Sequence, residues 1–209
     1  ELKKLSPEDQ IGYRPSIQGT EYTYKKPPLG TGLETAGITE VGIDTSLLAL
    51  FSQMNNGEYD HIHSLLIFKQ NKLVLEEYFH GYQREDLKDI RSAFKSISAM
   101  LVGKTVDEGY LAGVNVPLLD SYPAYDTIQG TAKRLITVGH ALTMTTGIEL
   151  EDEDEMQWNH KDWVGYKLSL PMVAMPGEAY TYSSGGMNLL SGIISHSTQE
   201  YLPHYLYTE

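Results

Sequence analysis

Residues 89–103 read Asp-Ile-Arg-Ser-Ala-Phe-Lys-Ser-Ile-Ser-Ala-Met-Leu-Val-Gly, and the interpretation of the whole chain starts from this stretch. Its apolar residues at positions 94, 97, 101 and 102 have the spacing of one face of an α-helix. Gly109 follows as a natural C-terminal stop. If Ser92 opens this helix, Lys95 lies one turn later on the same face, where its ammonium group can approach the Ser92 hydroxyl. The stretch therefore predicts a helix that begins with a serine–lysine pair.

This pair has the residue types that a serine nucleophile needs. A serine hydroxyl attacks well only when a neighbouring base takes its proton, and a lysine can serve when burial lowers its pKa. Unpaired N–H groups at the helix N-terminus can also stabilise the oxyanion of a tetrahedral intermediate. Ser-x-x-Lys is a weak signal by itself, because both residues are common and an ordinary capped helix contains the same pattern.

Upstream of this helix, the sequence predicts a small α+β arrangement. Residues 45–55 carry an apolar stripe with helical period behind a plausible cap. Residues 64–68 and 72–79 are β-prone runs with alternating apolar positions, which predicts an antiparallel hairpin covered by the helix. We divide the chain into an irregular leader at 1–44, a sheet portion at 45–91, and a nucleophile helix with a mostly helical subdomain at 92–209.

A second motif lies at residues 176–190, which read Pro-Gly-Glu-Ala-Tyr-Thr-Tyr-Ser-Ser-Gly-Gly-Met-Asn-Leu-Leu. With this stretch the chain resembles the β-lactamase-related serine hydrolases. That family holds class C β-lactamases, D-alanyl-D-alanine carboxypeptidases, penicillin-binding-type esterases and nylon-oligomer hydrolases. Ser92 to Lys95 look like its first motif, and Tyr182-Ser183-Ser184 look like its second, Tyr-x-Asn/Ser. Residues 136–147 are similar to the helix and turn that the family places between the two motifs.

The resemblance implies both a fold and a chemistry. The fold is β-lactamase/transpeptidase-like, an antiparallel sheet flanked by helices plus a mostly helical subdomain. Ser92 would be acylated, Lys95 would help to hold and accept its proton, Tyr182 would act as general base, and Ser184 would position the substrate or Lys95. The substrate would be a small-molecule ester or amide such as a β-lactam, a D-amino-acid peptide or a small ester. Neither a metal nor an organic cofactor is implied.

One departure from the family pattern limits this interpretation. The third motif, Lys or His followed by a variable residue and Gly, has no credible copy, because His196-Ser197-Thr198 lacks the glycine and falls in a predicted helix. We therefore expect the C-terminal strands of the sheet to be absent from this chain. Two alternatives to a self-sufficient enzyme stay open. One is a non-catalytic penicillin-binding-type relative that binds ligands or acts as a scaffold. The other is an incomplete fragment, active only with a C-terminal polypeptide of the same protein.

Composition excludes several other classes. The formal net charge of -12 argues against nucleic-acid binding, which needs clustered Lys and Arg. No apolar run approaches the roughly 20 residues of a transmembrane helix. The absence of cysteine excludes disulfides and thiolate metal sites. The chain begins at Glu1 rather than Met, which fits a processed precursor or an expression product. By family resemblance we expect an extracytoplasmic location, periplasmic or secreted.

Two further features have structural interpretations. The acidic run at residues 149–155 lacks the glycine and the ligand order of an EF-hand, so we expect a solvated loop rather than a calcium site. His140 lies in a predicted helical segment, and we expect it to have a packing role rather than a catalytic one, as for His61, His63 and His160.

Overall fold

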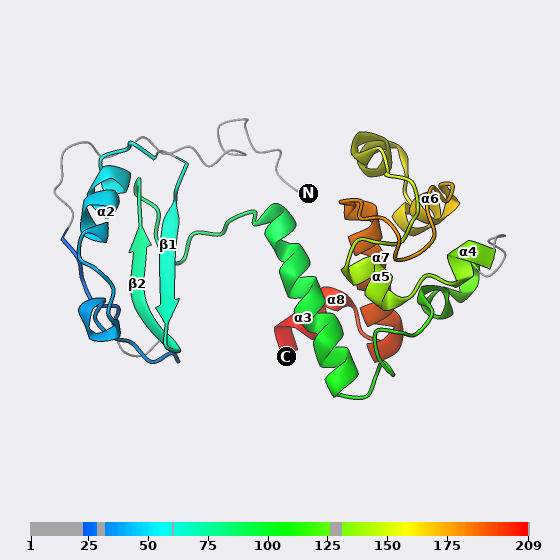
Figure 1. Ribbon diagram of the computed structural model, residues 1–209, viewed down its shortest axis with the longest axis horizontal. Coiled ribbons are helices and arrows are strands. Elements are labelled where there is room, and N and C mark those ends of the chain that lie inside the picture. The colour runs from blue at the N-terminus through cyan, green and yellow to red at the C-terminus, as the bar shows by residue number, and fades with distance from the viewer. Residues whose placement is uncertain (1–22, 29–31, 60, 126–130, 209) are drawn as a thin grey trace. The chain divides into compact units, whose positions relative to one another are not determined.

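The chain divides into two units, residues 1–88 and 89–209, which are described separately below. The computed structural model describes residues 23–28, 32–59, 61–125 and 131–208 (Figure 1). Much of the predicted leader, residues 1–22 and 29–31, lies outside the described residues.

The first unit contains the predicted hairpin. Strands β1 (Ser64–Lys69) and β2 (Lys72–Tyr78) pair antiparallel, with a register shift between Ile67 and Phe68 (Figure 1). The two turn residues, Gln70 and Asn71, have φ values of 53° and 59°. Tight two-residue hairpins of the I′ type need positive φ at both central residues, and asparagine tolerates that conformation well. The hairpin prediction is confirmed.

Helix α2 (Leu47–Asn55) and the end of the leader supply the core of this unit. Phe51 and Met54 of α2 are buried with Leu75 and Phe79. A neighbouring cluster surrounds Val74 of β2 and consists of Ala36, Ile38 and Val41, the last within the 3-10 turn η1 (Thr39–Val41). The predicted helix at 45–55 therefore exists, although it begins two residues later than expected.

The second unit is helical and is organised around one central helix. Its elements are η2 (Arg91–Ala93), α3 (Phe94–Asp107), η3 (Leu118–Ser121), η4 (Pro123–Tyr125), α4 (Thr131–Arg134), α5 (Val138–Leu142), the π-turn η5 (Glu155–Asn159), α6 (Trp163–Ser169), α7 (Ser184–Thr198) and α8 (Leu202–Thr208). Helices α3, α5, α6 and α8 and the turn η3 all contact α7. The fold is therefore α+β, as expected, with a two-stranded sheet among the described residues.

Helix α7 is held in this position by apolar burial on several sides. Leu189, Leu190, Ile193 and Ile194 are completely buried. Each fully buried side chain of this size contributes about 1.5–3 kcal/mol relative to an exposed one. These contacts fix α7 firmly, and its N-terminal end carries the second sequence motif.

Within the described segments, no helix is long and apolar enough to cross a membrane.

Candidate active site

Ser92 lies in the 3-10 turn η2, which runs directly into α3. The preceding residue, Arg91, has a φ of 45°, a left-handed conformation that costs a non-glycine residue energy. Its backbone N–H donates to Asp89 Oδ1 over 2.9 Å, which helps to hold this bend. The bend leaves Ser92 exposed at the start of the helical segment.

Lys95 connects the first motif to the second. Its Nζ donates to Ser92 Oγ over 2.8 Å and to Ser184 Oγ over 3.3 Å. The same ammonium group lies 5.2 Å from the centre of the Tyr182 ring. The structure thus brings together all four residues that the sequence singled out.

Tyr182 completes this cluster, and its neighbours lower the pKa of its phenol. Hydrogen bonds from Ser92 and from Lys95 lower the pKa of Tyr182 below its ordinary value of 10.0, and the Lys95 charge adds to the effect. The negative charge of Glu153 opposes this shift and raises the pKa. A phenol with a lowered pKa, hydrogen-bonded to a serine hydroxyl, can act as a general base.

Ser184 is the first residue of α7 and joins Lys95 to the acidic loop. Its hydroxyl accepts a hydrogen bond from Lys95 and donates one to Glu153 Oε1 over 2.6 Å. Sequence reasoning assigned no role to Glu153, because a carboxylate in an acidic run carries no signal for one particular contact. The contact joins residues 31 positions apart and depends entirely on the tertiary fold.

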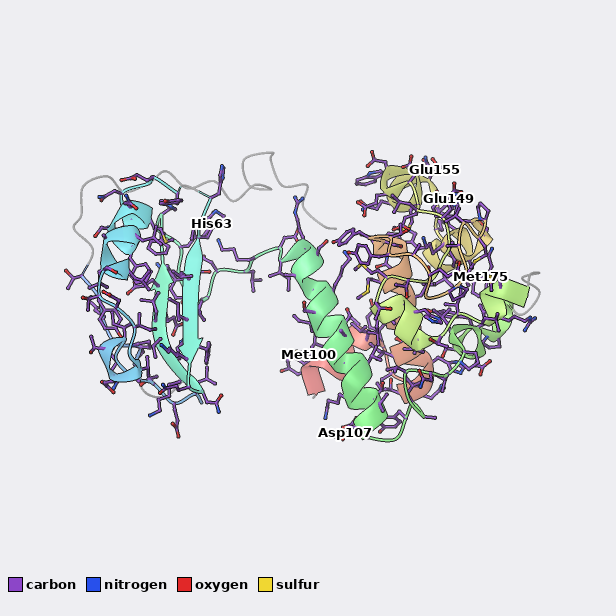
Figure 2. The ribbon with its side chains drawn as sticks, in the orientation of Figure 1. His63, Met100, Asp107, Glu149, Glu155 and Met175 are labelled. Atoms are coloured by element: carbon purple, nitrogen blue, oxygen red, sulfur yellow. The ribbon has the colours of Figure 1, made fainter. Side chains whose placement is uncertain are left out.

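The expectation of a solvated loop at residues 149–155 is wrong for one of its members. Glu149 and Glu155, labelled in Figure 2, mark the two ends of this loop, and Glu149 is exposed. Glu151 is buried and its carboxylate pairs with Lys167 Nζ at 2.6 Å. The available sequence signal was the Gly185-Gly186 pair in the first turn of α7, since glycine there suggests that another group approaches closely.

His140 has the structural role that we expected. Its Nδ1 accepts from the Thr137 N–H, and the Thr137 hydroxyl accepts from the His140 N–H, which forms a capping box at the start of α5. His63 stacks on Tyr82, and His160 stacks on Tyr166.

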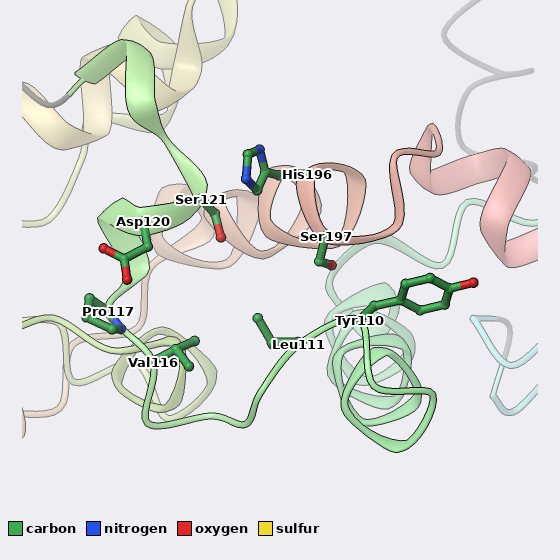
Figure 3. A pocket seen from close by; sticks show the side chains of 8 residues that line it. All are labelled: Tyr110, Leu111, Val116, Pro117, Asp120, Ser121, His196 and Ser197. Carbon is green, nitrogen blue, oxygen red and sulfur yellow. The ribbon is translucent and has the colours of Figure 1, made fainter.

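A separate groove of about 350 Å³ lies at the other end of α7 (Figure 3). It is lined by Tyr110, Leu111, Val116, Pro117, Asp120, Ser121, His196 and Ser197. Since α7 rises about 1.5 Å per residue, His196 lies roughly 18 Å along the helix from Ser184. His196-Ser197-Thr198 is indeed helical and does not contribute to the Ser92 cluster.

Comparison with known proteins places this chain in a family. The sequence profile of the Beta-lactamase family matches residues 63–209. Comparison with curated proteins gives no significant match.

Solved structures support the same fold at low sequence identity. A candidate beta-lactamase from Bacteroides dorei is 21% identical with a TM-score of 0.59, over 73% of this chain and 45% of that one. The octameric penicillin-binding protein homologue from Pyrococcus abyssi is 24% identical with a TM-score of 0.56, over 69% of this chain and 37% of that one. A candidate 6-aminohexanoate-dimer hydrolase from Bacillus anthracis is 17% identical with a TM-score of 0.55, over 92% of this chain and 50% of that one.

The aligned parts thus span half or less of each solved chain. The family profile nevertheless covers most of the present sequence, including Ser92, Lys95, Tyr182 and Ser184. With its α+β fold, its hydrogen-bonded Ser92–Lys95 pair and a profile match over residues 63–209, this chain belongs to the beta-lactamase family.

Proposed function

We propose that the chain is a serine hydrolase that cleaves an ester or amide through an acyl-enzyme on Ser92. One observation carries the proposal: Lys95 donates hydrogen bonds to the hydroxyls of both Ser92 and Ser184. Tyr182 lies beside this pair, where Ser92 and Lys95 lower the pKa of its phenol. Nucleophile, cation and base therefore lie within hydrogen-bonding reach of one another, which is the arrangement that nucleophilic catalysis requires.

The acylation step follows from this arrangement. The Tyr182 phenolate takes the proton of the Ser92 hydroxyl while Oγ forms a bond to the substrate carbonyl carbon. The tetrahedral intermediate then collapses, the bond to the leaving alcohol or amine breaks, and Tyr182 returns the proton to that group. The backbone N–H of Ser92 itself, at the start of the helical segment, is a suitable donor for the oxyanion. The next N–H, of Ala93, already donates to the Ile90 carbonyl oxygen over 3.0 Å.

Deacylation reverses the roles with water as the nucleophile. Tyr182 takes a proton from water, the hydroxide oxygen bonds to the acyl carbon, and the bond to Ser92 Oγ breaks as Oγ recovers a proton. The carboxylic acid product leaves and the site regains its starting protonation. Lys95 keeps its position throughout, where its positive charge favours the phenolate form of Tyr182.

We propose the substrate only as a broad class, a small ester or amide. A β-lactam, a D-amino-acid peptide and a small ester all present a carbonyl carbon to the same nucleophile. Ser92 and Tyr182 are both exposed, so the cluster is open to a small molecule from solvent. By family resemblance we also propose an extracytoplasmic location, and finding the native protein only in the cytosolic fraction would contradict it.

Covalent labelling tests the proposed function. The full chain is treated with a fluorophosphonate that reacts with activated serines, and its intact mass is measured before and after. We expect one adduct on the parent protein, none on Ser92→Ala, and one on Ser96→Ala, a matched control on the next turn of α3. An adduct that persists in Ser92→Ala would refute the nucleophile assignment. A parent protein that forms no adduct would favour the non-catalytic alternative.

A further inference from the structure

A buried ion pair lies beneath the second motif, outside the residues assigned to the reaction. The side chains of Glu151 and Lys167 are both 0% exposed, and Lys167 Nζ lies 2.6 Å from Glu151 Oε2. Lys167 also donates to the Glu149 carbonyl oxygen over 2.7 Å. The pair therefore joins the acidic loop to α6.

The Glu151 carboxylate also holds the N-terminus of α7. Its Oε2 accepts from Ser183 Oγ over 2.8 Å, and its Oε1 accepts from the Gly185 N–H over 2.6 Å. Ser183 in turn caps the helix, because its Oγ accepts from the Gly186 N–H over 2.8 Å. A negative charge at this end of a helix is favoured by the helix dipole.

This carboxylate is ionised despite its burial. Burial raises the pKa of Glu151, but hydrogen bonds from Lys167, Gly185 and Ser183 outweigh it and leave the pKa below the ordinary value. The charge is therefore present at neutral pH, so every donor around Glu151 has a charged acceptor.

The energetics of such a pair suggest a role other than stability. Removing two charges from water costs about as much as their attraction returns, and replacing a buried pair with apolar residues is often neutral or stabilising. What apolar residues cannot do is accept hydrogen bonds at defined positions. Ser183, which Glu151 binds, lies between Tyr182 and Ser184 in the chain, so a shift of Ser183 moves both neighbours.

We propose that Glu151, held in place by Lys167, is a positioning residue. It keeps Tyr182 and Ser184 in their positions relative to Ser92 and Lys95. The inference rests on the proposed function, in which these four residues act together. Glu151 does not touch the reacting atoms. It acts through Ser183 and the first turn of α7.

Two neutral double variants separate positioning from stability. Glu151→Leu/Lys167→Met removes both charges and the acceptor, whereas Glu151→Gln/Lys167→Met keeps an amide oxygen that can accept from Ser183 and Gly185. We expect both to fold, with circular dichroism spectra like that of the parent. We expect acylation by p-nitrophenyl acetate to fall by about 10- to 100-fold in the leucine variant, since small misplacements have effects of this size. The glutamine variant should retain more of the parental rate.

The pH dependence supplies a readout that a purely structural role would not move. Loosening the contacts of Tyr182 with Ser92 and Lys95 should return its pKa toward the ordinary value. The rising limb of the pH–rate profile should then shift to higher pH in the leucine variant. Thr137→Ala, which removes the α5 cap, is the control for destabilisation, and it should keep the parental pH profile.

A single substitution covers the case in which the leucine variant does not fold. Ser183→Ala removes the hydroxyl that links Glu151 to the N-terminus of α7. It should also slow acylation and shift the rising limb of the pH–rate profile to higher pH. A folded Ser183→Ala or leucine variant with the parental rate and pH profile would overturn the proposal.

Nuclear magnetic resonance titration keeps this test independent of the proposed function. Tyrosine-labelled protein, with the Tyr182 signal assigned from Tyr182→Phe, reports the pKa of that phenol without any turnover. If the parent does not acylate, the hydrolase proposal fails. The positioning proposal is then tested by the Tyr182 pKa alone: an increase in Ser183→Ala would support it, and an unchanged pKa would refute it.

Discussion

Gly185 donates its N–H to the Glu151 carboxylate over 2.6 Å, and the two residues are so close that an added Cβ would make unusually tight contacts. A Cβ built on Gly185 would lie 3.1 Å from Cδ of Glu151 and 3.1 Å from Cδ of Lys167. Glycine in a helix normally costs stability, because it gains freedom in the unfolded chain. At this position glycine avoids tight contacts with the buried ion pair.

We expect Gly185→Ala to lower the free energy of unfolding by about 1–3 kcal/mol, the usual cost of overpacking. The alanine would push Glu151 away from the helix N-terminus, so the variant should also label more slowly at Ser92. Gly103→Ala on α3 is the matched control, because a Cβ there meets nothing within 4 Å. It should stabilise the protein by about 0.5–1 kcal/mol. Chemical denaturation measures both, and equal effects of the two substitutions would contradict the steric argument.

Tyr182→Phe should reduce the acylation rate by about 10²- to 10⁴-fold, since it removes the proposed general base. The base acts as a phenolate, so the parental rate should rise with pH through the Tyr182 pKa. That limb should lie below pH 10.0, because Ser92 and Lys95 lower the pKa. A stopped-flow pH profile of acylation checks both statements. If Tyr182→Phe still shows the same rising limb in its pH–rate profile, another group is the base.

Glu153→Gln should move the same limb in the opposite direction from the Glu151 variants. The Glu153 charge raises the Tyr182 pKa, so its removal should shift the limb to lower pH. The glutamine amide oxygen can still accept from the Ser184 hydroxyl, which limits the structural change. Glu155→Gln is the control, because that carboxylate contacts Asn159 and His160 instead. No shift in Glu153→Gln, or the same shift in both, would contradict an electrostatic effect of Glu153 on Tyr182.

The Glu151–Lys167 pair should make the protein sensitive to acid. The pKa of Glu151 is lower in the folded chain than its ordinary value of 4.5, so the folded state favours the ionised form. Its contribution to stability is therefore fully present above pH 4.5 and is lost as the pH falls through the folded pKa. Denaturation midpoints at neutral and acidic pH measure the loss. The decline should be shallower in Glu151→Leu/Lys167→Met, and an identical decline would show that other carboxylates govern it.

Much of the local structure could be predicted because short-range patterns determine it. The helical spacing of apolar residues predicted the location of α3. Gly109, with a φ of 80°, lies just beyond the end of this helix, as expected. Alternation of apolar residues located the hairpin. The spacing of Ser92 and Lys95 was sufficient to predict their contact, because residues three positions apart in a helical turn lie on one face.

The sequence by itself thus determined α2, the hairpin, α3, the serine–lysine pair and, through resemblance, the second motif. Only the tertiary structure decided which partners these residues meet. Lys95 and Ser184 are 89 positions apart, and the contact forms because α3 and α7 pack against each other. Whether a carboxylate in an acidic run is solvated, like Glu149, or buried, like Glu151, depends on the packing of α6 and α7 around it. The charge pattern of a loop contains no information about that packing, because burial is a property of the assembled core.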